Sequence, residues 1–279
     1  MKVAFWSNAS EMCTVSANLA AISVACAIRS SYSIISMENH LCNHNLGKVY
    51  NRGPRTNILD EVGTNYYDGS GFEGLLRKIY RGDVHPGILK SYLTEIINKH
   101  LYYIPQSKII HNEIFDYELA HCIDPLFRMI DENSDICFID TASNNNLSTK
   151  IILEEADLIV VSLCQKSSIL EDFFLNYSSL ISKAVFIISQ YNHHSLYTLR
   201  QIANQYNISS ELLVPIPENE RYDIAYRNGY VHEFISRNIN CIKENPNFLF
   251  IQSIKKASHI IIKKVDQIAK QREIFLCGL

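Results

Sequence analysis

One short stretch of the sequence has the residue types and spacing of a metal site. The segment HLCNH places His40, Cys42 and His44 at alternate positions, so their side chains would share one face of an extended chain. Imidazole and thiolate groups gathered in that way can bind zinc. The rest of the sequence offers no matching second cluster. We therefore expect no metal site and interpret the alternation as a feature of a loop.

The composition is typical of a globular cytoplasmic protein. The chain has 279 residues, 47% of them hydrophobic, which is enough to bury a sizeable core. Its formal net charge of −3 gives no basic field that would hold a nucleic acid. The 8 cysteines are scattered without a CxxC pair, which favours reduced thiols. No Ser/His/Asp or Cys/His arrangement with a recognisable local pattern favours a hydrolase.

Short apolar runs rich in Val and Ile alternate with helical patterns along the chain. The runs show little period-two alternation, which is typical of strands buried on both faces. We predict strands at 2–6, 32–37, 101–104, 136–140, 157–163, 184–189 and 212–216. We predict helices at 15–29, 72–81, 88–100, 113–132, 147–155, 168–182, 196–206 and 221–228.

This alternation predicts an α/β fold with a doubly wound, mostly parallel sheet in a three-layer αβα arrangement. Residues 39–71 are the least regular, and we expect them to form a long surface excursion. No linker or repeat divides the chain, so we expect a single domain over 1–279. In such a sheet, ligands bind beyond the carboxyl ends of the strands, which selects the turns after Trp6, Met37 and Asp140.

Five regions of the sequence, taken in order, resemble the ParA/MinD family of P-loop ATPases. They span residues 1 to about 229 and read MKVAFWSNASEMCTVSANLAAISVA, SIISMENHLCNHNL, LYYIPQS, DICFIDTASNN with EEADLIVVSLCQ, and VFIISQYNHHSLYTLRQIANQYNI with LLVPIPENERYDIAYRNG. Within the family, the chain looks most like the divergent TadZ-like members that accompany pilus assembly. The resemblance implies a P-loop NTPase fold and relatives that close as dimers over ATP and Mg²⁺.

The first loop departs from the family pattern where relatives hold phosphate. With NLA (18–20) fixing the register, Trp6 and Glu11 stand on the two framing glycines and Met12 on the phosphate lysine. Glycines let successive N–H groups point at the anion, and the lysine neutralises its charge. Glu11 would repel a triphosphate, and Met12 offers it no charge. The resemblance therefore implies a degenerate phosphate loop.

The remaining positions of the first loop are compatible with two interpretations, a weakened nucleotide-binding site or a turn that only connects a strand to a helix. Ser7 falls on the family's signature lysine, Cys13 on the magnesium-binding threonine, and Thr14 keeps the expected type. Alternatively, the turn only joins a strand to a helix, with Ser10 or Thr14 as N-cap. The candidate nucleotide-binding positions in the loop are Ser7, Ser10, Glu11, Met12, Cys13 and Thr14.

The second and third turns carry the candidate catalytic residues. Glu38 falls on the first family acid after the second strand and His40 on the second acid, which helps to organise the attacking water. A histidine can act as a base near neutral pH, but its exchange for a carboxylate near magnesium favours a loss of activity. Asp140 matches the family's acid, whereas Asn144 replaces the glycine expected after it. Because a lone Asp often forms a turn, Asp140 cannot carry hydrolysis alone.

The base-binding side resembles the family more closely. Pro215, Pro217 and Glu218 match the loop whose backbone meets adenine in relatives, and Ser189 or Gln190 stands where the family often has an asparagine that reads the base. The loop is expected either to keep this pocket or to be retained only because it packs.

The C-terminal stretch 247–271 is predicted to be one amphipathic helix. An apolar stripe is spaced at i, i+3 or i+4, and lysines lie on or beside the opposite face. Such a helix usually covers its own sheet, and we favour that arrangement. Some family members instead bind membranes through a basic C-terminal helix, which leaves a peripheral membrane contact open.

The sequence thus predicts a localisation or assembly platform of pilus or cell-envelope machinery with weak or no ATP hydrolysis. The alternative is an active ATPase of partitioning or positioning that uses Asp140. We expect no resident cofactor, with ATP and Mg²⁺ as ligands if the loop binds. The expected partners are a second copy of the chain, contacted through Trp6 and Met12, and envelope proteins, but no specific nucleic acid. The protein would be cytoplasmic, with possible recruitment to the inner face of the membrane.

Overall fold

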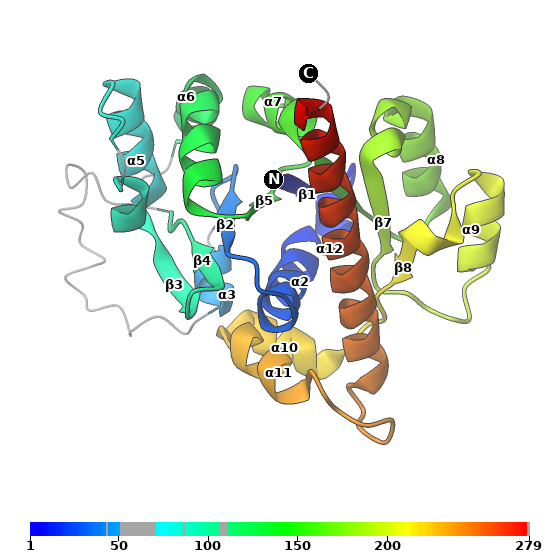
Figure 1. The fold of residues 1–279 in the computed structure, drawn as a ribbon. Helices are drawn as coiled ribbons and strands as arrows, with labels where there is room; N and C mark the ends of the chain where they lie inside the picture. The colour runs from blue at the N-terminus through cyan, green and yellow to red at the C-terminus, as the bar shows by residue number, and fades with distance from the viewer. Residues whose placement is uncertain (43, 51–70, 86, 107–110, 278–279) are drawn as a thin grey trace.

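An eight-stranded sheet forms the centre of the computed structural model (Figure 1). The structure describes residues 1–42, 44–50, 71–85, 87–106 and 111–277, and side chains there except those of Ser10, Glu11 and 275–277. The strands are β1 (Lys2–Trp6), β2 (Ile34–Glu38), β3 (Thr94–Ile97), β4 (Leu101–Tyr103), β5 (Ile136–Asp140), β6 (Leu158–Leu163), β7 (Ala184–Ile188) and β8 (Leu213–Pro215). Their order is β3-β4-β2-β5-β1-β6-β7-β8, and only β3 and β4 pair antiparallel. The predicted doubly wound, mostly parallel sheet is confirmed.

Helices cover both faces of the sheet and complete the three layers. One layer contains α2 (Val15–Arg29), α3 (Leu46–Tyr50), α10 (Glu220–Asn228), α11 (Val231–Asn238) and α12 (Phe248–Cys277). The other contains α5 (Gly71–Tyr80), α6 (Asn112–Asn133), α7 (Leu147–Glu155), α8 (Ser167–Asn176) and α9 (Leu199–Gln205). Shorter elements are α1 (Ser10–Cys13), η1 (Leu89–Tyr92), η2 (Ser178–Lys183) and η3 (Ser210–Leu212).

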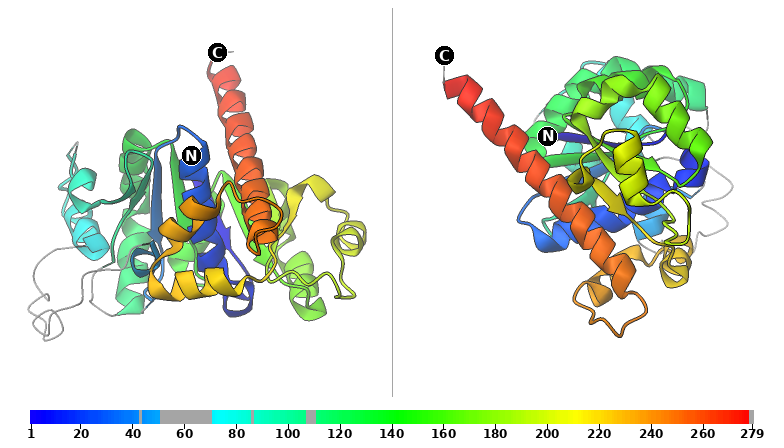
Figure 2. Two further views of the ribbon diagram at one scale, coloured as in Figure 1. Left: turned by 90° about the horizontal axis from the view of Figure 1, so that it is seen from below. Right: turned by 90° about the vertical axis from the view of Figure 1, so that its right-hand side faces the viewer.

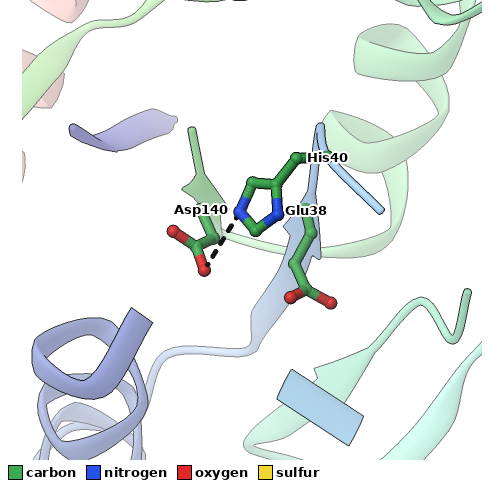
Figure 3. Close-up of side chains that lie close together, drawn as sticks. All are labelled: Glu38, His40 and Asp140. Carbon is green, nitrogen blue, oxygen red and sulfur yellow. Dashed lines mark ion pairs between the residues drawn. The ribbon is translucent and has the colours of Figure 1, made fainter. Parts of the chain in front are cut away.

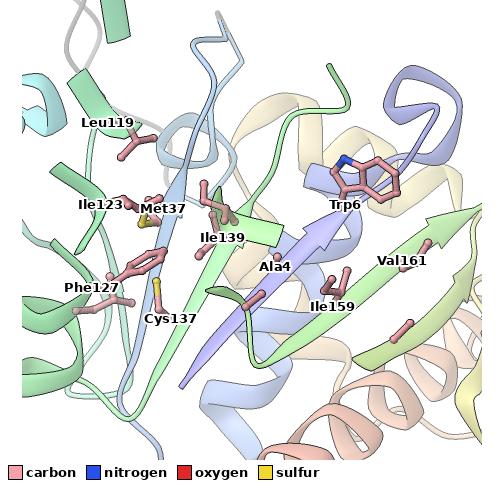
Figure 4. Close-up of a cluster of buried hydrophobic side chains, with 14 of the residues drawn as sticks. Ala4, Trp6, Met37, Leu119, Ile123, Phe127, Cys137, Ile139, Ile159 and Val161 are labelled. Carbon is pink, nitrogen blue, oxygen red and sulfur yellow. The ribbon is translucent and has the colours of Figure 1, made fainter. Parts of the chain in front are cut away.

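The central strands are mostly apolar because each of their faces packs on a helical layer. Every residue of β2, β5, β6 and β7 is buried. On one face, Leu119, Ile123 and Phe127 of α6 pack toward Met37 and Ile139 of the sheet (Figure 4). Two large buried clusters, one on each face, hold the strands in place and so fix the edge where their carboxyl ends meet.

Several helices begin or end where the sequence supplies a capping residue. The side chain of Asn146 accepts a hydrogen bond from the Thr149 N–H at the start of α7, and Thr198 forms a capping box with Gln201 at the start of α9. Gly229 ends α10 in the left-handed conformation, with φ of 75°.

The predicted helix at 88–100 is wrong. The segment forms η1 followed by β3, which pairs antiparallel with β4 at the edge of the sheet. Thr94, Ile96 and Ile97 are β-branched and suit a strand, and Lys99 turns the chain with φ of 63°. The periodicity of this stretch is compatible with both structures, and pairing with β4 selects the strand.

The expected surface excursion at 39–71 is also partly wrong. Residues 51–70 and 43 lie outside the described residues, but Leu46, Val49 and Tyr50 of α3 are buried in the core.

Helix α11, which the sequence analysis did not predict, packs on α2. The predicted helix at 168–182 is α8 followed by the separate turn η2.

The C-terminal helix packs on its own sheet, as favoured from the sequence. The apolar stripe on α12 that includes Phe250, Ile254, Ile261 and Val265 is buried in the core shared with α2. The helix is longer than predicted, and its last turns extend past the body of the protein (Figure 2). Among the helices that the structure describes, none is both long enough and apolar enough to cross a membrane.

Candidate functional site

The carboxyl ends of β1, β2, β5 and β7 meet beside a cavity of about 580 Å³. Its lining includes Thr14, His40, Asp140 and Gln190, which the sequence analysis selected as candidate catalytic or nucleotide-binding residues. This is the edge of the sheet where a doubly wound fold places its ligands. The turns after Trp6, Met37 and Asp140 therefore contribute to one region, as the strand order requires.

Glu38, His40 and Asp140 form a compact buried group at this edge (Figure 3). Glu38 and Asp140 are partners in the parallel pairing of β2 with β5, so their side chains leave the same face of the sheet. His40 Nε2 lies 3.5 Å from Asp140 Oδ2. Glu38 Oε2 accepts a hydrogen bond of 2.6 Å from the Tyr103 hydroxyl, and Glu38 Oε1 accepts one of 3.1 Å from the Leu46 N–H.

Asn39 holds His40 against Asp140. Its main-chain N–H donates to the Asp140 carbonyl at 3.1 Å, and its side-chain oxygen accepts from the Ala142 N–H at 2.7 Å. The side chain of Asn39 also donates to Thr149 Oγ1 at 2.9 Å. These bonds join the loop after β2 to the loop after β5, so the neighbourhood of His40 and Asp140 is built into the fold.

The charged side chains in this group shift one another's pKa values. Burial and the neighbouring Asp140 carboxylate raise the pKa of Glu38 to about 7, although Tyr103 and Leu46 oppose the shift. Burial lowers the pKa of His40, but the carboxylates of Asp140 and Glu38 outweigh it and raise that pKa to about 9. An imidazolium beside the Asp140 carboxylate is thus favoured near neutral pH, which makes His40 a poor general base there.

The first loop forms a helical turn in place of an open cradle. The N–H groups of Met12 and Cys13 both donate to the Ala9 carbonyl, at 3.0 and 3.1 Å, and the Ala9 N–H donates to Ser7 Oγ at 3.0 Å. Thr14 follows with φ of 47°. Thr14 stands at the predicted N-cap position of α2, but its side chain makes no capping hydrogen bond, and α1 has Ala9, not Ser10, as its N-cap.

Trp6 and Met12 do not share an exposed patch. Trp6 is 2% exposed and packs against Phe173 and Tyr177 of the core, with ring centroids 6.3 and 4.9 Å away. Met12 is 49% exposed, and its sulfur accepts a hydrogen bond from Lys166 Nζ at 3.3 Å. The expected Trp6 contact with a partner is therefore wrong, because the ring is buried against Phe173 of α8 and against Tyr177.

Cys13, which the sequence resemblance aligned with a magnesium-binding threonine, is buried. Hydrogen bonding with Cys164 and burial raise the pKa of the Cys13 thiol, while the same contact lowers the pKa of Cys164 to about 7. A buried neutral thiol is a poor ligand for Mg²⁺, which prefers oxygen atoms.

The base-side residues are divided between packing and the cavity. Ser189 is buried, and its hydroxyl accepts from the Asn18 side chain at 2.8 Å and donates to the Cys13 carbonyl at 2.7 Å. Gln190 is exposed and lines the cavity. Pro215, Pro217 and Glu218, on β8 and the loop after it, are absent from the lining given by the described residues.

The His40, Cys42 and His44 side chains do not converge. His40 turns toward Asp140, whereas His44 Nε2 lies 3.2 Å from the Tyr226 carbonyl and the His44 N–H donates to Cys42 Sγ at 3.4 Å. Alternate positions share a face only in an extended strand, and this stretch lies beyond the end of β2.

One helix was not expected near this cavity from the sequence. Asp223, Tyr226 and Arg227 of α10 line it together with the loops after β2 and β5. Their spacing of i, i+3 and i+4 places the three side chains on one face of the helix. The sequence alone does not show that this face lies next to the site. Tyr103, which supports Glu38, was also missed because it comes from the neighbouring strand β4.

Solved structures with the same fold are ParA and MinD ATPases. A ParA family ATPase from Chlorobium tepidum superposes with a TM-score of 0.68 at 13% identity, covering 92% of this chain and 98% of that one. MinD from Pyrococcus horikoshii in complex with Mg-ADP gives 0.65 at 14% identity, covering 93% and 95%. MinD in the MinC:MinD complex of Aquifex aeolicus gives 0.63 at 13% identity, covering 94% and 95%. No protein-family model and no curated protein sequence matches the chain.

Proposed function

We propose that this chain uses the ParA/MinD fold as a localisation or assembly platform, with weak or no ATP hydrolysis. The observation that carries the proposal is the first loop. The Met12 and Cys13 N–H groups are bonded to the Ala9 carbonyl, and the family's phosphate lysine is replaced by Met12. A phosphate site needs free N–H groups and positive charge at the same place.

The residues of the loop do not fit a magnesium triphosphate. Ser7 aligns with the family's signature lysine and carries no charge. Cys13 aligns with the residue whose hydroxyl binds the metal, but it is a buried thiol. Charge-assisted hydrogen bonds contribute on the order of 1.5–3 kcal/mol each, so losing several removes most of the affinity for a nucleotide.

The platform would act through protein partners. Met12 leaves an exposed apolar side chain on the face where relatives of this fold close on one another, which supports a homodimer that forms without nucleotide. A similar structure, MinD of Aquifex aeolicus, is complexed with the partner protein MinC. The assignment to pilus or cell-envelope machinery rests on the resemblance to TadZ-like sequences.

We place this platform in the cytoplasm, and the described cysteines support that location because none forms a disulfide. The buried stripe of α12 is occupied by the protein's own core, so a peripheral membrane contact would have to use the projecting end of the helix. Ile274 is 73% exposed there.

The second candidate is an ATP-binding ATPase, favoured by one observation. The cavity at the strand ends brings together Thr14 and Asp140, which both keep the residue types expected of active relatives. Such an enzyme would require the α1 turn to open and release its N–H groups.

Titration calorimetry with Mg-ATP on the full chain separates the two. The platform predicts no binding or a dissociation constant above the millimolar range, together with a dimer in light scattering without nucleotide. A micromolar dissociation constant, or a monomer at tens of micromolar chain that dimerises only with Mg-ATP, would overturn it.

A further inference from the structure

Glu38, His40 and Asp140 place one ligand atom each within 4.8 Å of one another. The His40 Nε2 to Asp140 Oδ2 separation is 3.5 Å. Two ligands that each lie about 2.1 Å from a tetrahedral metal ion are about 3.4 Å apart. The measured pair therefore already has the spacing of two neighbouring ligands, and a carboxylate oxygen of Glu38 lies within 4.8 Å of both.

The orientation of Asp140 gives an independent reason to look for a ligand. Asp140 is 1% exposed, and its Oδ2 atom is buried without a hydrogen-bond partner. A buried carboxylate oxygen without a donor is costly, and native structures usually satisfy it. Oδ2 faces His40 at 3.5 Å without a hydrogen bond, so a metal ion bound between them would satisfy this oxygen and replace the proton on the imidazole.

The carboxylate of Glu38 is held in the manner of a supported metal ligand. Tyr103 and the Leu46 N–H each bond one of its oxygens, and Glu38 itself is 1% exposed. Outer partners of this kind fix a ligand's orientation and are found around most metal sites in proteins. Each carboxylate oxygen keeps a second lone pair for a metal.

We propose that Glu38, His40 and Asp140 bind a divalent transition-metal ion, with Zn²⁺ as the reference ion, without any nucleotide. One imidazole and two carboxylates are a ligand set that suits Zn²⁺ better than Mg²⁺, which prefers oxygen ligands only. Two carboxylates also balance the charge of the ion, with His40 in its neutral form. The site does not depend on the proposed function, because none of its ligands comes from the first loop.

The metal has a route in and room for a further ligand. His40 and Asp140 both line the cavity of about 580 Å³, whereas Glu38 lies behind them. Three protein ligands beside an open space leave the fourth position of a tetrahedral ion to water or to a small anion.

The test is metal binding by the full chain after chelator treatment, in buffer without nucleotide. We expect one equivalent of Zn²⁺ by equilibrium dialysis, and one equivalent of Co²⁺ with visible absorption bands of a four- or five-coordinate ion. His40→Gln and Asp140→Asn should each weaken binding roughly tenfold or more and remove the bands. His44→Gln is the matched control, because His44 is in the same loop but faces the Tyr226 carbonyl, and it should bind as the wild type does.

Circular dichroism and the melting temperature of each variant show whether it is folded. His40 keeps 26% of its side chain exposed, so His40→Gln is the variant expected to fold if Asp140→Asn does not. Absence of stoichiometric binding in folded wild type, or unchanged binding in folded His40→Gln, overturns the proposal. Loss of binding in His44→Gln and Cys42→Ser would place the metal at the HLCNH segment and also overturn it.

Discussion

Ser189, the residue that follows β7, donates a hydrogen bond of 2.7 Å to the main-chain carbonyl of Cys13. The same hydroxyl accepts from the Asn18 side chain at 2.8 Å. A residue expected to read a nucleotide base thus joins β7 to the first loop and to α2. The side chain of Ser189 therefore stabilises the fold.

Ser189→Ala should lower the free energy of unfolding by about 1–2 kcal/mol, because the buried Asn18 amide loses its shortest hydrogen bond. Urea denaturation measures the change. Gln190→Ala is the control, since Gln190 is exposed on the cavity wall and should alter stability by less than about 0.5 kcal/mol. Equal stability of the two variants would contradict the structural role of Ser189.

Met12→Lys alone should not create micromolar ATP binding. The new ammonium group would lie next to Glu11 in sequence, and the N–H groups of Met12 and Cys13 would still be bonded to Ala9. The variant should fold normally because Met12 is 49% exposed. Calorimetry with Mg-ATP checks this, and a micromolar dissociation constant would show that the missing charge was the single defect of the loop.

Tyr103→Phe should weaken Zn²⁺ binding by roughly 10- to 100-fold, the usual effect of losing an outer partner of a ligand. The substitution removes the 2.6 Å hydrogen bond to Glu38 and leaves His40 and Asp140 in place. A competition assay with a metal-binding dye measures the change. If the affinity stayed the same, Glu38 would not be a ligand, and a two-residue site would remain.

In buffer with a chelator, Glu38 should make the protein less stable as the pH rises from about 4.5 to about 7. Its pKa in the folded protein is raised to about 7 from an ordinary value of 4.5, so folding favours the protonated form. That contribution is complete below pH 4.5 and is lost through pH 7. Glu38→Gln removes this titration, so its stability curve should fall less over the interval. Parallel curves for the two proteins would show that Glu38 does not titrate in this range.

Ile254→Ala in α12 should lower the free energy of unfolding by about 2–5 kcal/mol, because Ile254 is fully buried in the core shared with α2. Ile274→Ala, on the projecting end of the same helix, should change it by less than about 0.5 kcal/mol because Ile274 is 73% exposed. Thermal or urea unfolding compares the two.

Sedimentation with anionic liposomes that is lost only in Ile274→Ala would favour a membrane contact at that end.

The sequence determined the fold class because its information is local. A strand buried on both faces must be apolar at nearly every position, so the runs that became β1, β2, β5, β6 and β7 are recognisable without any knowledge of their neighbours. The same reasoning failed at 88–100, where only Ile96 of the edge strand β3 is buried and the pattern also fits a helix.

The sequence also identified Glu38, His40 and Asp140 as residues that follow strands, but only the tertiary structure decided what they form together. Glu38 and Asp140 become neighbours because β2 pairs with β5 in one particular register, which is set by packing between segments far apart in the chain. Asn39 then brings His40 onto Asp140 and away from Cys42 and His44. The apparent metal motif in the sequence was local, whereas the compact group in the structure comes from two strands, and no spacing along a single segment encodes that contact.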